Sequence, residues 1–209
     1  MLTKIKLNLE DLQLVSAEHE SALAKMQEAA QKEQKREEWL KKRQYKFSSS
    51  NCHRLMTYED KIDTFPKGAM TYVEEVVIEI LTAGKGKNNY TSDSMDRGNE
   101  EEKFAVLKFE EKTGLKLYAT NEDQEFIQMC SYFGGTPDGL FDGVVYNPIL
   151  EKLIEDGLVE IKCPDSKTHL FYLRNINNWE NLKKICANYY WQIQGNLLAT
   201  GRKTSYFIS

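Results

Sequence analysis

The sequence lacks clustered cysteine. Its four cysteines stand far apart, with neither a Cys-x-x-Cys pair nor a Cys/His group: Cys52, Cys130, Cys163 and Cys186. Zinc sites and disulfide scaffolds both need closely spaced ligands. We therefore expect reduced, mostly buried thiols. An iron–sulfur cluster would need more cysteines near the C-terminus than this chain provides.

Long apolar runs are also missing. The N-terminus has no apolar stretch of the kind found in signal peptides, and no segment approaches the roughly 18 apolar residues of a membrane span. We expect an intracellular protein with no membrane partner. Its 209 residues suit one domain with a substantial core, and 41% hydrophobic and 11% aromatic residues indicate a globular chain.

An excess of positive charge is the third absence. The net charge is −4, whereas DNA-binding proteins usually carry a basic surface. A site built from several carboxylates is acidic by construction, however, and bound divalent cations reverse its sign. Basic residues gather in short groups that either line a channel or form a solvated face: Lys35-Arg36, Lys41 to Arg43, Lys85 with Lys87, and Arg202-Lys203.

Two short segments carry the chemistry. Residues 136–139 (Thr-Pro-Asp-Gly) place the Asp138 carboxylate at a turn, and residues 160–162 (Glu-Ile-Lys) continue an apolar strand. Successive side chains of a strand point to opposite faces, so Glu160 and Lys162 share one face. With Asp138 beside them, two carboxylates hold Mg²⁺ while Lys162 positions or activates the attacking water, as metal-dependent phosphodiester cleavage requires. The structural alternative is an ordinary turn and a solvated charge pair.

Helical patterns dominate the N-terminal half. Residues 8–43 predict one long helix without Pro or Gly, which either packs on the domain, mediates oligomerisation or binds a partner. Residues 48–51 supply N-cap side chains for a second helix that runs to Met56. Residues 84–89 predict a polar loop. A helix from Lys67 carries an apolar stripe that we expect in the core: Val73, Val76, Val77, Ile80 and Leu81.

The C-terminal half alternates helices and strands. The predicted elements are a helix at 98–113, strands at 115–129 and 132–135, an excursion at 141–156, a strand at 159–162, a helix at 181–200 and a strand at 204–208. The last helix has a core-facing stripe: Ile185, Tyr189, Ile193 and Leu197. Together these elements predict an α/β fold with a mixed central sheet flanked by helices.

These segments together resemble the PD-(D/E)xK nuclease superfamily, and more closely the lambda exonuclease / YqaJ viral recombinase family. Four blocks carry the resemblance in matching order: Trp39 to Ser50, Gly98 to Gly114, Thr136 to Pro164, and Tyr189 to Gly201. It implies a restriction-endonuclease-like core at residues 38–209, preceded by an N-terminal helical extension at 1–37. Family members usually continue with at least one more strand and helix, so we expect this domain to be truncated at its C-terminus or unusually short.

The resemblance also implies roles for single residues around a metal. Asp138, Glu160 and the carbonyl of Ile161 bind Mg²⁺, for which Mn²⁺ substitutes, and Lys162 acts on the attacking water. Glu102, rather than the neighbouring Glu101, ligates a metal directly or through water.

Further residues are expected to contact the DNA. Gln192 orients Lys162 or a phosphate in the active site. Arg43, Ser48 and Ser50 contact the 5′-phosphate of a DNA end, and the hydroxyl of Thr136 contacts the scissile or terminal phosphate.

The implied function is a 5′-to-3′ exonuclease on double-stranded DNA that leaves 3′ single strands for an annealing protein in phage-type recombination. Ring-shaped homotrimers and a cytoplasmic location in a bacterial or phage-infected cell follow from the same resemblance. Residue chemistry alone reaches only a two-metal phosphodiesterase. A structure-selective or restriction-type endonuclease uses the same catalytic residues. Also compatible with the sequence are an iron–sulfur nuclease relative and a non-catalytic DNA-end or protein-binding module.

Overall fold

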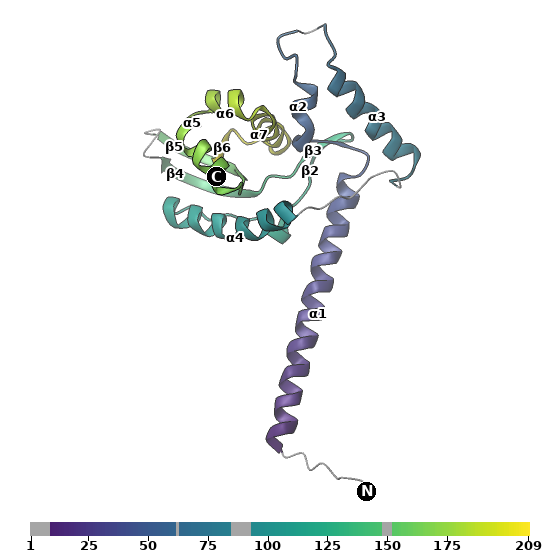
Figure 1. Ribbon diagram of the computed structural model, residues 1–209, viewed down its shortest axis with the longest axis vertical. Coiled ribbons are helices and arrows are strands. Elements are labelled where there is room, and N and C mark those ends of the chain that lie inside the picture. Colours follow the sequence, from purple (N-terminus) through teal and green to yellow (C-terminus); the bar gives the residue numbers. More distant parts are fainter. Residues whose placement is uncertain (1–8, 62, 85–92, 148–151) are drawn as a thin grey trace. The chain divides into compact units, whose positions relative to one another are not determined.

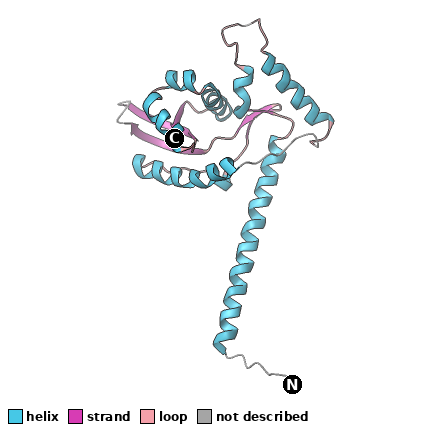
Figure 2. Cartoon of the chain, viewed as in Figure 1, coloured by secondary structure: helices cyan, strands magenta, loops and turns pink. Residues whose placement is uncertain are grey.

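The computed structural model describes residues 9–61, 63–84, 93–147 and 152–209. The chain divides into two compact units, Met1–Glu38 and Trp39–Ser209, and each is described by itself. Within the described residues, all strands belong to the second unit, and the other regular elements are helices (Figure 2). None of the described helices has the length and apolar character needed to cross a bilayer.

Helix α1 (Leu9–Arg43) forms the described part of the first unit and ends in the second. Its sequence favours a helix because it contains neither Pro nor Gly and is rich in Ala, Glu, Gln and Lys. Side chains four positions apart support it: the Lys32 ammonium lies 2.8 Å from the Glu28 carboxylate, and the Gln34 amide donates to Glu38 over 3.0 Å. Each such pair contributes a few tenths of a kcal/mol. The predicted long helix is confirmed.

The second unit contains both helices and strands (Figure 1). Its first part contains β1 (Phe47–Ser48), the 3₁₀ helix η1 (Ser49–Asn51), α2 (Cys52–Leu55), α3 (Lys67–Leu81), α4 (Asp93–Thr113) and the 3₁₀ helix η2 (Asn121–Asp123). There follow β2 (Ile127–Cys130), β3 (Phe133–Gly135), β4 (Gly139–Asn147), β5 (Lys152–Ile161), α5 (Ser166–Asn175), α6 (Trp179–Ile185), α7 (Ala187–Thr200) and β6 (Thr204–Ile208).

The described strands form two three-stranded sheets, in the orders β1-β3-β2 and β4-β5-β6. Both are mixed: β1 is parallel to β3 and β6 is parallel to β5, whereas the β2–β3 and β4–β5 pairs are antiparallel. The prediction of a single central sheet is therefore wrong for these residues. Pro137 lies where β3 ends and β4 has not yet begun, and its missing N–H interrupts any continuous ladder at that point.

The expected excursion at residues 141–156 is instead an antiparallel strand pair. The pairing runs from Gly139 opposite Val159 to Asn147 opposite Lys152, and the register shifts between Phe141 and Val144. Gly143 takes the positive φ of 109° at this bulge, and its N–H donates to Asp156 over 3.0 Å. Gly143 and its hydrogen bond to Asp156 thus bend the hairpin at this bulge.

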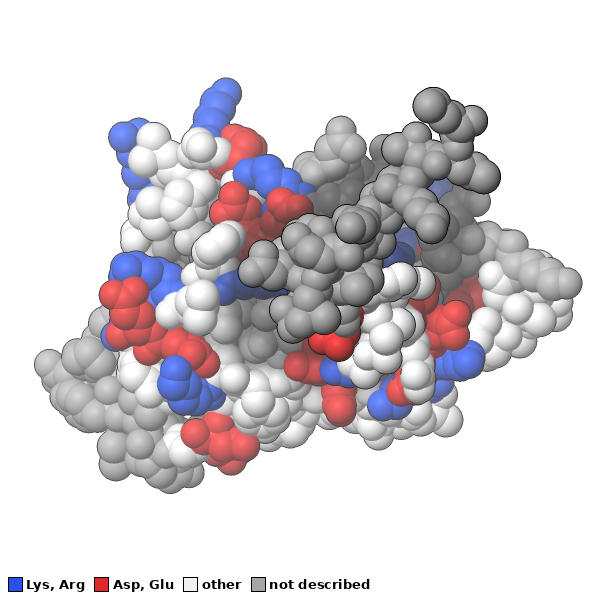
Figure 3. Space-filling model, turned by 90° about the horizontal axis from the view of Figure 1, so that it is seen from below, with Lys and Arg blue, Asp and Glu red and all other residues white. Residues whose placement is uncertain are grey.

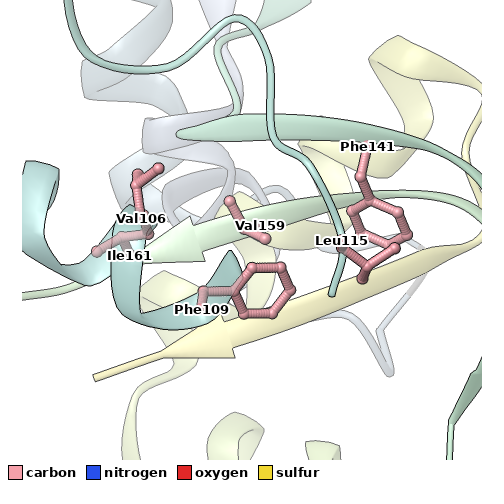
Figure 4. Packing of buried hydrophobic residues seen from close by; sticks show 6 residues of the cluster. All are labelled: Val106, Phe109, Leu115, Phe141, Val159 and Ile161. Carbon is pink, nitrogen blue, oxygen red and sulfur yellow. The ribbon is translucent and has the colours of Figure 1, made fainter. Parts of the chain in front are cut away.

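One hydrophobic core lies between α4 and one face of the β4-β5-β6 sheet (Figure 4). Val159 and Ile161 of β5 meet Val106 and Phe109 of α4, while Phe141 of β4 is completely buried. Burying each of these side chains contributes about 1.5–3 kcal/mol. The alternation of strand side chains leaves Leu158 and Glu160 on the opposite face.

A second core covers that opposite face of the sheet. Leu182, Cys186 and Ile193 are buried, with Tyr189 and Phe207 packed against them. The predicted stripe of the last helix is confirmed as core-facing, although Cys186, with φ −133° and ψ 62°, separates α6 from α7. The sheet is therefore enclosed on both sides, so a polar side chain on the face beneath α7 is removed from water.

Helix α3 lies in its predicted place, but the predicted core stripe is right at Val76 and wrong at its three C-terminal members. The buried side chains are Ala69, Tyr72, Val76 and Glu79, whereas Val77, Ile80 and Leu81 are exposed, the last by 78%. Apolar residues occupy most positions of this helix and lie on more than one face, so helical periodicity alone did not single out the buried one. Residues 85–89 of the loop predicted after α3 lie outside the described residues.

Candidate active site

The carboxylates of Asp138 and Glu160 are brought together by strand pairing. Asp138 directly precedes β4, and its N–H donates to the carbonyl of Val159 over 3.2 Å. Its carboxylate in turn accepts from the N–H of Ile161 over 2.7 Å. The hairpin therefore places Asp138 beside the end of β5, and one backbone hydrogen bond sets the direction of its carboxylate.

The ammonium of Lys162 lies among three oxygen atoms. It donates to the Asp138 carboxylate over 3.3 Å, to Oε1 of Glu160 over 2.5 Å and to the Ile161 carbonyl over 2.9 Å. The ring of Tyr189 lies 5.4 Å from the same nitrogen, within cation–π range. These oxygens belong to three of the four residues that the sequence proposed as metal ligands, and they converge on one positive charge.

Burial gives this cluster unusual electrostatics. Glu160 is 0% exposed, and desolvation followed by the charge of Asp138 raises its pKa, although Lys162 and Asn196 act in the opposite direction. Desolvation lowers the pKa of Lys162, but the two carboxylates outweigh it and the net shift is upward. When both carboxylates are ionised, two negative charges face one ammonium, and the remaining negative charge favours a further cation.

Glu102 of α4 belongs to the same electrostatic cluster. Desolvation, then the charge of Asp138, raises the pKa of Glu102 to about 7, while Lys162 and a hydrogen bond from Gln124 lower it. That hydrogen bond runs from the Gln124 amide to the Glu102 carboxylate over 2.8 Å. A carboxyl with this pKa changes its protonation near neutral pH and gains most from a nearby divalent cation.

The donor set fits a divalent cation. Mg²⁺ is usually bound by one or two carboxylates together with water and phosphate oxygens, and Asp138, Glu160 and the Ile161 carbonyl supply such a set. No group of three or more His, Cys, Asp and Glu side chains that could hold a metal occurs in the part of the chain that the structure describes. A cation here would therefore depend on two carboxylates, with Glu102 in electrostatic reach.

The side chains of Arg43, Ser48 and Ser50 form a second polar cluster. The Arg43 guanidinium donates to the hydroxyls of Ser48 and Ser50 over 3.2 and 3.0 Å, and the two hydroxyls lie 3.0 Å apart. Burial lowers the pKa of Arg43, whereas Tyr72 and Glu79 act in the opposite direction. The predicted helix-capping role is wrong, because neither Ser48 nor Asn51 accepts a capping hydrogen bond through its side chain.

Trp39 connects this cluster with the loop that carries Asp138. Its indole N–H donates to the hydroxyl of Thr136 over 3.1 Å, and the Arg43 guanidinium lies 4.9 Å from the Trp39 ring. Thr136 precedes Asp138 by two residues. The proposed phosphate-contacting side chains therefore belong to one connected set with the candidate metal ligands.

Gln192 is the predicted site residue that the structure does not bring into this network. Its side chain forms no hydrogen bond with the described residues, although it is partly buried on α7. Asn196, one turn further along α7, makes the contacts instead: its amide lies 3.1 Å from Oε2 of Glu160 and 3.4 Å from the Thr136 carbonyl. The only hint in the sequence was the four-residue spacing, which places Asn196 on the same helix face as Gln192.

Arg202 does not line a channel with the basic groups expected from the sequence. Its guanidinium donates to the carbonyls of Phe141 and Gly157 and to the side chains of Tyr118 and Asp142. It therefore braces the bulge of the β4–β5 hairpin. On the face shown in Figure 3, acidic and basic side chains are interspersed rather than gathered by sign.

Comparison with known proteins shows the family of the chain and a similar fold. The family model of the YqaJ-like viral recombinase domain matches residues 38–203, and the chain belongs to this family. Among curated proteins none matches.

Two solved structures of an alkaline exonuclease, LHK-Exo from Laribacter hongkongensis, are similar to the chain. The complex of LHK-Exo with dAMP shares 25% identity at a TM-score of 0.60, over 82% of this chain and 72% of that one. The other structure shares 24% identity at a TM-score of 0.57, over 82% and 74%.

Proposed function

We propose that the chain is a Mg²⁺-dependent exonuclease of phage-type recombination. It digests double-stranded DNA from the 5′ end towards the 3′ end and leaves 3′ single strands. The observation that carries this proposal is the convergence of the Asp138, Glu160 and Ile161 oxygens on the Lys162 ammonium. Membership of the YqaJ-like family supports it, as does the complex of LHK-Exo with dAMP, because a deoxynucleoside monophosphate is the unit that an exonuclease releases.

The oxygens that surround Lys162 would hold the metal ion. Asp138, Glu160 and the Ile161 carbonyl bind Mg²⁺, and Mn²⁺ substitutes for it. Glu102 contributes directly or through a water molecule. When bound, the ion lowers the pKa of the attacking water and balances charge on the phosphate.

Lys162 acts as a proton donor in hydrogen bonds rather than as a free base. Its raised pKa keeps the ammonium charged over the working pH range, so it orients the attacking water and neutralises a phosphate oxygen. Gln192 assists in orienting Lys162 or the phosphate. The buried Glu160 carboxylate and the half-buried Asp138 carboxylate keep the Lys162 nitrogen in place before DNA arrives, which reduces the cost of positioning it.

Recognition of the DNA end belongs to the cluster of Arg43, Ser48 and Ser50. A guanidinium and two hydroxyls directed at each other form a set of donors suited to a terminal 5′-phosphate. Thr136 contacts the scissile or terminal phosphate through the hydroxyl that Trp39 orients. The 5′-to-3′ polarity is expected because the Trp39–Thr136 hydrogen bond links this cluster to the loop that leads to Asp138.

The β4-β5-β6 sheet with α4 and α7 forms the PD-(D/E)xK core within a domain at residues 38–209, and residues 1–37 form a helical extension. A homotrimer is the proposed assembly, and a single-strand annealing protein is the proposed partner. The exposed apolar side chains of α3 support self-association, because an apolar patch of this kind usually marks an interface: Met70, Val77, Ile78, Ile80 and Leu81.

The test is digestion of linear duplex DNA labelled at one 5′ end or the other, with a covalently closed circle in parallel. The wild-type chain should remove nucleotides from 5′ ends in Mg²⁺ and leave the circle intact. Glu160→Ala should be inactive, and Glu180→Ala, at an exposed position of α6, should match wild type. Cutting of the circle would favour the endonuclease, and binding of DNA ends without digestion would favour the non-catalytic module.

A further inference from the structure

Asn196 is completely buried between α7 and the sheet, although its side chain is polar. It is 0% exposed and lies on α7 above the face of β5 that carries Glu160. Burying an amide is costly unless it forms hydrogen bonds. The contacts of Asn196 therefore indicate why a polar residue occupies this position.

The neighbours of Asn196 fix the orientation of its amide. Oε2 of Glu160 and the carbonyl of Thr136 lie 3.1 and 3.4 Å from its nitrogen. Both atoms are acceptors, so only the NH₂ group can face them. In the opposite orientation the buried amide oxygen would face two acceptor oxygens, with which it forms no hydrogen bond. The direction of this hydrogen bond thus follows from the chemistry of its partners.

Glu160 divides its two carboxylate oxygens between two donors. Oε1 accepts from Lys162 and Oε2 accepts from Asn196. Without the Asn196 donor, Oε2 would be buried and unpaired, and a buried acceptor without a partner is costly, more so when it is charged. The carboxylate would then be free to rotate about its last bond.

Asn196 also touches both segments that form the site. Besides Glu160 on β5, it reaches the carbonyl of Thr136, two residues before Asp138. The close approach depends on Gly135, because a Cβ at that position would lie closer than 3.0 Å to the Asn196 amide oxygen. A single amide therefore sets the position of the Asp138 loop relative to the Glu160 carboxylate.

We propose that Asn196 is the positioning residue that holds Glu160 with one oxygen directed towards the metal-binding position. It does not touch the substrate or the ion. It occupies Oε2 so that Oε1 faces the point where the Asp138 and Ile161 oxygens converge. This inference rests on the proposed metal site. It gives α7 a role in metal binding through Asn196, whereas the sequence predicted a role for this helix through Gln192.

The primary test is calorimetric titration of Mn²⁺ into the full chain without DNA. Asn196→Ala removes the donor, and loss of such an outer partner typically weakens metal affinity by about 10–100-fold. Asn188→Ala is the matched control, because it removes an exposed amide from the same helix. We expect the Mn²⁺ Kd to rise about tenfold or more in Asn196→Ala and to stay unchanged in Asn188→Ala.

Asn196→Ser guards against a failure to fold, since the smaller side chain keeps a polar group at this position. Urea unfolding identifies the variants that are folded. In active variants, the Mg²⁺ concentration for half-maximal cleavage should rise while the KM for DNA stays unchanged. A purely structural role would lower stability and leave both values as in wild type.

The proposal is overturned if both Asn196 variants fold and bind Mn²⁺ within about twofold of wild type. It is also overturned if the wild-type chain binds no Mn²⁺. Weaker Mn²⁺ binding by Asn196→Ala in a chain that cleaves no DNA would support the positioning role and reject the proposed nuclease function. The two proposals therefore fail separately.

Discussion

Replacing Glu102 with Gln should stabilise the metal-free protein at alkaline pH. The pKa of Glu102 is raised from 4.5 to about 7, chiefly by desolvation and then by the charge of Asp138. A carboxyl whose pKa is higher in the folded chain binds more protons there than in the unfolded chain. Its favourable contribution is therefore complete below the unfolded pKa, near 4.5, and is lost as the pH rises through about 7.

The magnitude follows from the same pKa. A rise to about 7 corresponds to about 3.4 kcal/mol at about 1.36 kcal/mol per pH unit. Because Glu102 is only partly buried, solvent screening reduces this, and we expect about 1–2 kcal/mol. Glu102→Gln keeps the acceptor for Gln124 and removes the charge. At about pH 8 the variant should be more stable by this amount, and at about pH 4 it should equal wild type.

The assay is urea unfolding in a chelator, followed by tryptophan fluorescence. All three tryptophans, Trp39, Trp179 and Trp191, belong to the second unit, so the signal reports on the unit that contains Glu102. Glu101→Gln, at the exposed neighbouring position, is the control and should change stability little. Saturating Mn²⁺ should reverse the order, because ligand at about 100 times its Kd adds about 2.7 kcal/mol to a chain that binds it fully. Equal stability of wild type and Glu102→Gln at alkaline pH in chelator would refute the reasoning.

Two further predictions concern catalysis and end recognition. Lys162→Ala should lower cleavage by about 10²–10⁴-fold without weakening Mn²⁺ binding, because the ammonium occupies the position of a cation. Single-turnover digestion measures the cleavage and calorimetry measures the Mn²⁺ affinity. Undiminished cleavage would remove Lys162 from the mechanism. Arg43→Ala should lower the preference for 5′-phosphorylated over 5′-hydroxyl ends by about 10–100-fold, since it loses charge-assisted hydrogen bonds of about 1.5–3 kcal/mol. Lys41→Ala, an exposed position in the same helix turn, is its control, and equal loss on both kinds of end would contradict the pocket.

The sequence was sufficient where a local pattern dictates geometry. The two-residue period of a strand places Glu160 and Lys162 on one face whatever surrounds them, and the structure brings both together with Asp138. The long helix over residues 9–43 followed equally directly from composition. Spacing between blocks was enough to predict family membership, which the match over residues 38–203 confirms.

Other features depended on contacts between distant residues. Helix α3 carries apolar side chains on more than one face, so only packing decided that Tyr72 and Val76 face inwards and Leu81 faces outwards. The predicted excursion at 141–156 is, in its described residues, an antiparallel pair with a bulge, because β4 pairs with β5. Ser48 and Ser50 carry hydroxyls suited to capping, yet both accept hydrogen bonds from the Arg43 guanidinium.

Asn196 is the clearest example of a residue whose role depends on the tertiary structure. As one amide among several on α7, nothing in its local sequence distinguishes it from Asn188 or Gln192. Its burial and its hydrogen bond to Glu160 arise because α7 crosses the sheet face at that point. The sequence by itself determined which residues carry charge along each strand, because strand geometry is local. Only the tertiary structure decided which distant side chain pairs with the buried carboxylate, because that pairing depends on how the layers pack.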